Sequence, residues 1–206
     1  MKRKLTMNKP EKIIFATGNE DKMKEIRMIL KDVGIPIESL KDAGVEADIV
    51  EDGKTFEENA IIKAKAVMEM TGCITLADDS GLEVDYINKE PGIYSARYLG
   101  RDTSYEEKNQ NIIDRLKDAK GDERSARFVC VIAAALPDGR ILTARGTIEG
   151  VIGYEEKGHN GFGYDPILYV PEYGMTTGEM TMEDKNKISH RGKALTEIRR
   201  KLKEIL

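Results

Sequence analysis

The chain has 206 residues, of which 40% are hydrophobic and 34% charged, and its formal net charge is −4. This composition is ordinary for a soluble globular protein, and the length suits one large domain or two small lobes that share a core. No apolar run approaches the roughly 18 residues that a membrane helix needs. The basic residues are dispersed, without the stripe and interleaved aromatic residues typical of a nucleic-acid groove. We therefore expect neither a membrane nor a nucleic acid as a partner.

The two cysteines, Cys73 and Cys130, lie far apart in apolar stretches and form no Cys-x-x-Cys pair. Neither a zinc site nor a disulfide framework is indicated. Buried free thiols in a reducing compartment are the simplest interpretation, which predicts a cytoplasmic protein.

The amino terminus is basic but has no apolar segment behind it, which argues against a secretory signal. We interpret residues 1–11 as an N-terminal extension, with Met7 as an alternative start. The rest of the chain contains no repeat, low-complexity segment or flexible linker. Residues 12–206 are therefore predicted to form a single domain.

In the first third of the chain, predicted strands and helices alternate. Residues 12–17 (KIIFAT) predict a buried strand, and Gly18-Asn19 then leads into an amphipathic helix. Residues 35–40 predict a short strand. The sequence Thr55-Phe56-Glu57-Glu58 is a capping box that opens a helix running to about Thr71.

The middle of the chain begins with an apolar strand, 73–78 (CITLAD), which is predicted to end on Asp78-Asp79-Ser80-Gly81. A second capping box, Ser104 to Glu107, opens a helix to about Ala119. Residues 127–152 predict a hairpin of long strands around Pro137-Asp138-Gly139-Arg140.

A glycine-rich loop over 158–166 follows the hairpin, and a last helix is predicted from about Ser189 to Ile205. Early alternation of helices and strands, followed by antiparallel strands, predicts an α/β protein with a mixed sheet.

Two predicted helices begin with cations, although the helix dipole favours anions there. Asn19 caps the first helix and Lys22 lies in its first turn. Ser189 caps the last helix, and His190, Arg191 and Lys193 lie in its first turn. A bound phosphate would make the position of these cations favourable, because the cations and the amide groups of the helix start would then converge on one anion. Exposed basic residues are also common in first turns, so the alternative of a plain solvated surface stays open.

Lys63 lies in an unusual place on its helix. It shares the apolar stripe of Phe56, Ala60, Val67 and Met70. One interpretation is a lysine that snorkels at the rim of the core. The other is an ammonium group aimed at an anionic ligand.

Acidic residues supply the complementary half of a site for a metal and a triphosphate. Asp78 and Asp79 stand at the predicted end of an apolar strand, a common position for catalytic groups in α/β proteins. Glu51 and Asp52 precede the second helix. Because Mg²⁺ needs only one or two protein carboxylates when phosphate oxygens and water complete its shell, these residues suit a metal–triphosphate enzyme.

Six segments of the sequence, taken together, closely resemble the inosine/xanthosine triphosphate pyrophosphatase family, also called Ham1-like. They are FATGNEDKMKEI, GKTFEENAIIKAKAV, LADDSGLEVD, PGIYSARY, GFGYDPIL and KNKISHRGKAL. The match spans about residues 12–200, although 101–125 carries no family signature. The resemblance implies an elongated mixed β-sheet flanked by helices, two lobes with a central nucleotide-binding cleft, and a homodimer.

The resemblance also implies roles for individual residues. Asp79 is similar to the family's proton acceptor and metal ligand, Glu51 to a second metal ligand, and Lys63 to a lysine that points at phosphate. Ser80 is expected to touch the substrate. The other implied substrate contacts are a triphosphate-binding turn (Thr17, Gly18, Asn19 and Lys22), a base-recognition loop (Phe162, Gly163, Tyr164 and Asp165), and further base and phosphate contacts (Lys185, His190 and Arg191).

The predicted function is Mg²⁺-dependent hydrolysis of deaminated purine nucleoside triphosphates, namely ITP, dITP and XTP, to the monophosphate and pyrophosphate. This activity would cleanse the nucleotide pool. A related Maf-like pyrophosphatase acting on pyrimidine nucleotides is one alternative. A nucleotide-binding module without turnover is the other, although carboxylates placed for a metal argue against it.

Overall fold

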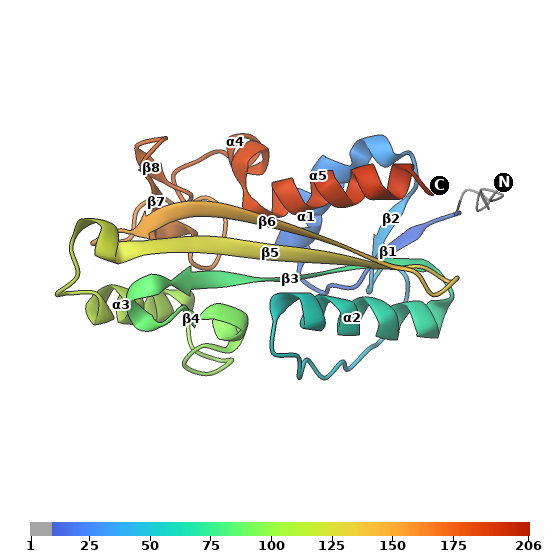
Figure 1. Cartoon of the computed structure of the whole chain (residues 1–206), viewed down its shortest axis with the longest axis horizontal. Helices are drawn as coiled ribbons and strands as arrows, with labels where there is room; N and C mark the ends of the chain where they lie inside the picture. The colour runs from blue at the N-terminus through green and yellow to red at the C-terminus, as the bar shows by residue number, and fades with distance from the viewer. Residues whose placement is uncertain (1–9) are drawn as a thin grey trace, which may run out of the picture. The chain divides into compact units, whose positions relative to one another are not determined.

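The computed structural model describes residues 10–206 and contains a mixed sheet flanked by helices (Figure 1). The strands are β1 (Ile13–Phe15), β2 (Ile37–Ser39), β3 (Ile74–Val84), β4 (Glu90–Pro91), β5 (Ser125–Ala135), β6 (Ile141–Ile152), β7 (Leu168–Val170) and β8 (Met175–Thr176). The α-helices are α1 (Glu20–Leu30), α2 (Phe56–Thr71), α3 (Tyr105–Arg115), α4 (Met182–Ile188) and α5 (His190–Lys203).

The strand order is β2-β1-β3-β5-β6-β7-β8, with β4 paired to β3. Strand β1 runs parallel to β2 and β3, whereas the β3–β4, β6–β7 and β7–β8 pairs are antiparallel. The predicted α/β class with a mixed sheet is therefore confirmed.

The chain divides into two compact units. Of the described residues, the first unit comprises 10–79, together with Val131–Arg145 and Ala194–Leu206. The second comprises Ser80–Cys130 and Gly146–Lys193. Of the predicted N-terminal extension, residues 1–9, including Met7, lie outside the described residues. The extension and the single domain over 12–206 stay predictions.

The first unit is built on the parallel strands. All three residues of β1 are at most 1% exposed, as expected for a strand covered on both faces. Helices α1 and α2 lie on opposite faces of the sheet (Figure 1). Helix α1 turns Met23, Ile26 and Leu30 inward.

Helix α2 begins and ends where the sequence predicts. Thr55 caps it by accepting a hydrogen bond from the Glu58 amide, and it ends at Gly72 in the left-handed conformation (φ +66°) that glycine tolerates. The predicted stripe is wrong at its last position, because Met70 is 59% exposed. Ala64 is fully buried instead.

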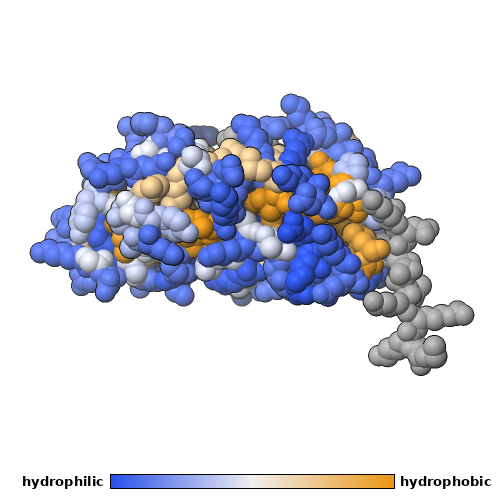
Figure 2. All heavy atoms as spheres, turned by 90° about the horizontal axis from the view of Figure 1, so that it is seen from above, coloured by the Kyte–Doolittle hydropathy of each residue, from blue (hydrophilic) through white to orange (hydrophobic). Residues whose placement is uncertain are grey.

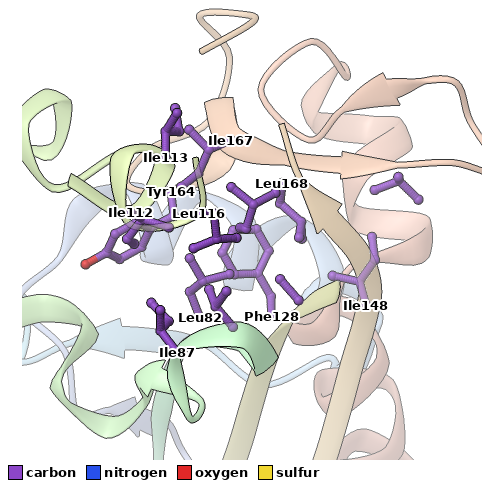
Figure 3. Packing of buried hydrophobic residues seen from close by; sticks show 14 of the residues in the cluster. Leu82, Ile87, Ile112, Ile113, Leu116, Phe128, Ile148, Tyr164, Ile167 and Leu168 are labelled. Atoms are coloured by element: carbon purple, nitrogen blue, oxygen red, sulfur yellow. The ribbon is translucent and has the colours of Figure 1, made fainter. Parts of the chain in front are cut away.

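The second unit has its own apolar core beneath α3. Figure 3 shows Leu82, Ile112, Leu116, Phe128 and Ile167 packed together, with side chains drawn from strands, helix and loop. The predicted capping box of α3 is present in both directions between Ser104 and Glu107. Figure 2 shows a face covered mostly by hydrophilic residues, with smaller apolar patches between them.

Two predicted boundaries are wrong, and one helix was not predicted. Strand β3 does not end at Asp78 but continues to Val84, because its polar residues have partners that let them stay within the sheet. Helix α3 ends at Arg115, before Ala119. The last helix is preceded by α4, which the sequence analysis did not predict.

Candidate active site

Four residues of the first unit form a hydrogen-bonded group that we call the Lys63 cluster: Glu51, Asn59, Lys63 and Asp79. The Lys63 ammonium lies 3.0 Å from Glu51 Oε2 and 3.5 Å from Asp79 Oδ1. The Asn59 amide donates to Asp79 Oδ2 at 3.2 Å. The Lys63 side chain is 12% exposed, so this ammonium is aimed at carboxylates and not simply snorkelling into water.

The environment of the cluster shifts two protonation equilibria. Burial raises the pKa of Asp79, although Lys63 and Asn59 act in the opposite direction. Burial alone would lower the pKa of Lys63, but Asp79, Asp78 and Glu51 together raise it above its ordinary value. Lys63 is therefore held as a cation beside a carboxylate whose pKa is raised by burial.

Asp78 and Asp79 belong to separate ion pairs. Asp78 Oδ2 lies 2.9 Å from the Lys22 ammonium of α1, whereas Asp79 faces Asn59 and Lys63 of α2. Successive side chains of a strand point to opposite faces, and α1 and α2 cover opposite faces here. The sequence could not separate these two carboxylates, but the structure assigns Asp79 to the face that also carries Glu51.

The predicted triphosphate-binding turn connects β1 to α1. The Asn19 side chain caps α1 by accepting from the Lys22 amide at 3.0 Å, and Thr17 Oγ1 accepts from the Asn19 amide at 3.1 Å. A side chain added at Gly18 would meet nothing within 4 Å. The turn therefore offers open space next to a capped helix start.

The predicted base-recognition loop is organised by the buried carboxylate of Asp165 in the second unit. Its Oδ2 accepts from the Phe162 amide at 2.8 Å and from the Lys185 ammonium at 2.7 Å, and its Oδ1 accepts from Thr177 at 2.9 Å. Gly161 has φ +77°, and a Cβ there would lie 2.2 Å from Asp165 Oδ2. The contacts of Asp165 thus build the loop, and only glycine fits at its entrance.

The Phe162 ring lies beside two cations. Lys185 Nζ is 5.1 Å and Arg191 Cζ 5.7 Å from the ring centroid. Phe162 and Gly163 also line a pocket of about 360 Å³ together with Glu156, residues 158–161 and Pro166. An aromatic face with hydrogen-bond donors nearby is an arrangement that can bind a planar heterocycle.

The remaining predicted contacts of the second unit gather where α4 meets α5. Arg191 is 1% exposed and donates to Ser80 Oγ at 3.3 Å. The His190 ring lies 5.0 Å from that of Phe128. Ser189 Oγ accepts from the Gly192 amide at 2.9 Å, which confirms Ser189 as the cap of α5.

Tyr164 has a different environment from its neighbours in the loop. Its side chain is 5% exposed, and its hydroxyl donates to the Ser95 carbonyl oxygen at 2.7 Å. Burial raises the pKa of this phenol. The side chain belongs to the core of the second unit, which leaves the backbone of Tyr164 for contacts with a ligand.

Comparisons with known proteins identify the family of the chain. The model of the Ham1 family matches residues 13–201. The chain belongs to the Ham1 family. A protein of Clostridium perfringens named dITP/XTP pyrophosphatase is 48% identical over 202 residues, which cover 95% of this chain and 99% of that protein. A protein of the same name from Desulforamulus reducens is 50% identical over 184 residues, covering 89% and 92% of the two chains.

Solved structures of the family have the same fold. A HAM1 protein from Coxiella burnetii matches with a TM-score of 0.85 and 42% identity, over 94% of this chain and 98% of that one. The Ham1 protein of Staphylococcus aureus also gives a TM-score of 0.85, with 38% identity and the same coverage. The predicted family and the flanked mixed sheet are confirmed.

Sequence reasoning missed Asn59, which is fully buried and holds Asp79. Its signal was available, because Asn59 and Lys63 are four residues apart and share a face of α2. It also missed Thr177 beneath the base loop, for which the sequence offers no local signal.

The oxygen ligands of the Lys63 cluster fit a magnesium ion. Glu51 and Asp79 both reach one positively charged atom, Lys63 Nζ, so both can reach one cation. In residues 10–206 no three His, Cys, Asp or Glu side chains gather into a group that could hold a metal by themselves. Two carboxylates are nonetheless what Mg²⁺ uses when phosphate oxygens complete its shell.

Proposed function

We propose that this protein hydrolyses the deaminated purine nucleoside triphosphates ITP, dITP and XTP to the monophosphate and pyrophosphate. Membership of the Ham1 family and the shared name of the curated relatives support this proposal. The observation that carries it is the Lys63 cluster, where a buried carboxylate of raised pKa, a second carboxylate and a firmly protonated lysine converge. Anion-binding and water-activating groups then lie within one hydrogen-bonded group.

In the proposed reaction, Asp79 orients a water molecule and accepts its proton as the water attacks the α-phosphorus. Asn59 holds Asp79 in place through Oδ2. Lys22 and Lys63 offset the charge that develops on the departing pyrophosphate. Such positioning and charge stabilisation provide most of the acceleration in phosphoryl transfer.

We further propose that Glu51 and Asp79 hold Mg²⁺ as the cofactor. A bound Mg²⁺ would supply Lewis-acid polarisation of the phosphate oxygens. The base would stack on Phe162, while Lys185 and Arg191 donate to the 6-keto group that hypoxanthine and xanthine share. Adenine has an amino group at that position and would leave those donors without an acceptor.

The experiment is hydrolysis of a nucleotide panel (ITP, dITP, XTP, GTP, ATP, CTP and dTTP) in ¹⁸O-labelled water, with and without Mg²⁺. We expect ITP, dITP and XTP to be cleaved in the presence of Mg²⁺, with pyrophosphate as the second product and the ¹⁸O label in the monophosphate. Asp79→Asn, purified in parallel, controls for contaminating phosphatases. Label in pyrophosphate, or release of diphosphate and orthophosphate, would contradict attack at the α-phosphorus.

The same panel addresses the two alternatives. Preferential cleavage of CTP or dTTP would point to a pyrimidine-directed enzyme, which the family membership does not favour. Binding of ITP without any turnover would point to a nucleotide-binding module.

A homodimer and a cytoplasmic location complete the proposal. Light scattering of the purified protein tests the dimer, for which the expected mass is twice 23.1 kDa. None of the helices in residues 10–206 has the length and apolarity required to cross a membrane.

A further inference from the structure

Helix α3 packs against the base loop, although its sequence carries no resemblance to the family's motifs. The Tyr105 ring meets the Tyr164 ring edge-on, with centroids 5.3 Å apart. A Cβ added at Gly163 would lie 3.5 Å from Tyr105. The helix therefore touches the loop at two consecutive residues.

Asn109 makes the polar contact between α3 and the loop. It is 1% exposed, and its Nδ2 donates to the Gly163 carbonyl oxygen at 3.2 Å and to Glu156 Oε1 at 2.5 Å. Within residues 10–206, Asn109 Oδ1 has no hydrogen-bond partner. This position therefore uses the two N–H donors of an amide and not its carbonyl group.

The contact lies at Gly163, whose backbone can rotate over a wider range than that of other residue types. Asp165 fixes the amide of Phe162, which sets the peptide that precedes the aromatic ring. Gly163 follows with φ +69°, in a region that is easily accessible to glycine and allows wide rotation. On the other side, Asn109 Nδ2 donates to the Gly163 carbonyl oxygen, and the Asp165 amide donates to the Phe162 carbonyl oxygen at 3.3 Å. The segment Phe162-Gly163 is thus pinned at both ends.

We propose that Asn109 is a positioning residue for base selectivity, which it controls by fixing the Gly163 peptide and with it the Phe162 ring. This inference rests on the proposed function, in which Phe162 stacks on the base. Asn109 touches neither phosphate-binding nor metal-binding residues, so its effect should be confined to the base.

The test compares variants of two asparagines on the same helix. Asn109→Asp keeps the shape but removes both donors, and Asn109→Ser is a smaller alternative in case the charged variant does not fold. Asn111→Ala is the matched control, because Asn111 accepts from the Tyr98 hydroxyl at 2.9 Å and has no contact with the loop among the hydrogen bonds of α3.

The measurements are kcat and KM for ITP and ATP, inhibition by inorganic pyrophosphate, and hydrogen exchange of the loop amides 162–165. In both Asn109 variants we expect kcat/KM for ITP to fall about five- to tenfold, mainly through KM, as expected for one lost hydrogen bond to a buried carbonyl. The value for ATP should change much less, inhibition by pyrophosphate should be unchanged, and loop exchange should accelerate. Asn111→Ala should keep the wild-type ratio of kcat/KM for ITP to kcat/KM for ATP.

Two different failures can be distinguished. A wild-type protein without preference for ITP over ATP would overturn the proposed function itself. A selective wild type whose Asn109 variants keep their selectivity, or lose it no more than Asn111→Ala, would overturn only the positioning role. A uniform loss for ITP, ATP and pyrophosphate binding would also overturn it, because such a loss indicates general damage to the fold.

Discussion

The two aspartates of β3 have very different surroundings although they are adjacent in the sequence. Asp78 is 2% exposed and has its charge matched directly by Lys22. Asp79 is 8% exposed, and its Lys63 partner is shared with Glu51. We propose Asp79 as the proton acceptor because burial raises its pKa, although Lys63 and Asn59 act in the opposite direction.

Replacing Asp79 by Asn removes a proton acceptor and a predicted metal ligand but keeps the side-chain shape. We expect kcat for ITP to fall by at least about 100-fold, the loss typical of a missing general base. Asp78→Asn is the matched control and should retain more activity, because Asp78 pairs with Lys22 of α1 and makes no ion pair with Lys63 among those of residues 10–206. Steady-state kinetics at saturating Mg²⁺ would measure both, and near-normal turnover of Asp79→Asn beside an inactive Asp78→Asn would reverse the assignment.

Lys63 occupies the position between the two predicted magnesium ligands, which leads to a second prediction. Lys63→Met should lower kcat/KM for ITP, because a cation near the phosphates is lost. In the absence of nucleotide it should bind Mn²⁺ more tightly, since Glu51 and Asp79 no longer share an ammonium. Electron paramagnetic resonance of free Mn²⁺ would measure this affinity.

The control for this prediction is Lys22→Met, which removes an equal charge but one paired with Asp78. Equal gains in Mn²⁺ affinity for both variants would show that the affinity depends on the net charge of the protein and not on the position of Lys63. An unchanged kcat/KM for Lys63→Met would mean that Lys63 is a structural lysine at the rim of the core.

At the scale of elements, the base loop combines an aromatic face with polar groups, and the two parts should have separable effects. Phe162→Ala should weaken all nucleotides alike, because stacking contributes about 1–3 kcal/mol whatever the base. Arg191→Ala should instead narrow the gap between ITP and ATP, because a donor to the 6-keto group is lost. The ratio of kcat/KM values for the two nucleotides measures this, and an equal loss for both would identify Arg191 as a phosphate ligand.

Arg124 connects the end of α3 to the end of β6 inside the second unit. Its guanidinium is almost fully buried and donates to the carbonyl oxygens of Leu116 (2.6 Å), Ala119 (3.4 Å), Ile152 (2.7 Å) and Gly153 (2.7 Å). Such a set of charge-assisted bonds uses the planar five-donor group that only arginine has. Arg124 thus connects α3 to β6 through hydrogen bonds to backbone carbonyl oxygens, and none of these four bonds involves a carboxylate.

Arg124→Met should therefore lower the free energy of unfolding by about 3 kcal/mol or more, because several buried carbonyls lose their donor at about 1–3 kcal/mol each. Arg200→Met is the control, since Arg200 is 57% exposed on α5 in ion pairs with Glu197 and Glu204. Pairs of this kind contribute about 0–1 kcal/mol. Urea unfolding followed by circular dichroism would compare the two variants, and similar losses would contradict the role given to Arg124.

Across the whole molecule, elements marked by local signals were predictable. The caps Asn19, Thr55, Ser104 and Ser189 all start helices as the sequence indicated. Strand β3 was cut short because its two aspartates look like the end of a strand, whereas partners on α1 and α2 keep them in the sheet. Tertiary contacts overrode the local pattern there.

In the candidate site too, a residue was predictable only where the local sequence carried a signal. Lys63 was found because a lysine in an apolar stripe is anomalous on its own helix. Asn109 and Thr177 were not found, because each acts only through residues more than ten positions away that folding brings to it. Pairing between distant segments leaves no mark in a single sequence.

The alternation of Asp78 and Asp79 in β3 also has an evolutionary consequence. A point substitution changes one side chain, but a deletion of one residue between Ile74 and Ala77 would move every later residue to the other face. Asp79 would then meet the Lys22 side of the sheet, and no carboxylate would remain beside Asn59. Insertions at the hairpin tip, Pro137–Gly139, would leave that spacing untouched. Descendants of this gene should therefore vary freely in length at the tip and stay fixed in length along β3.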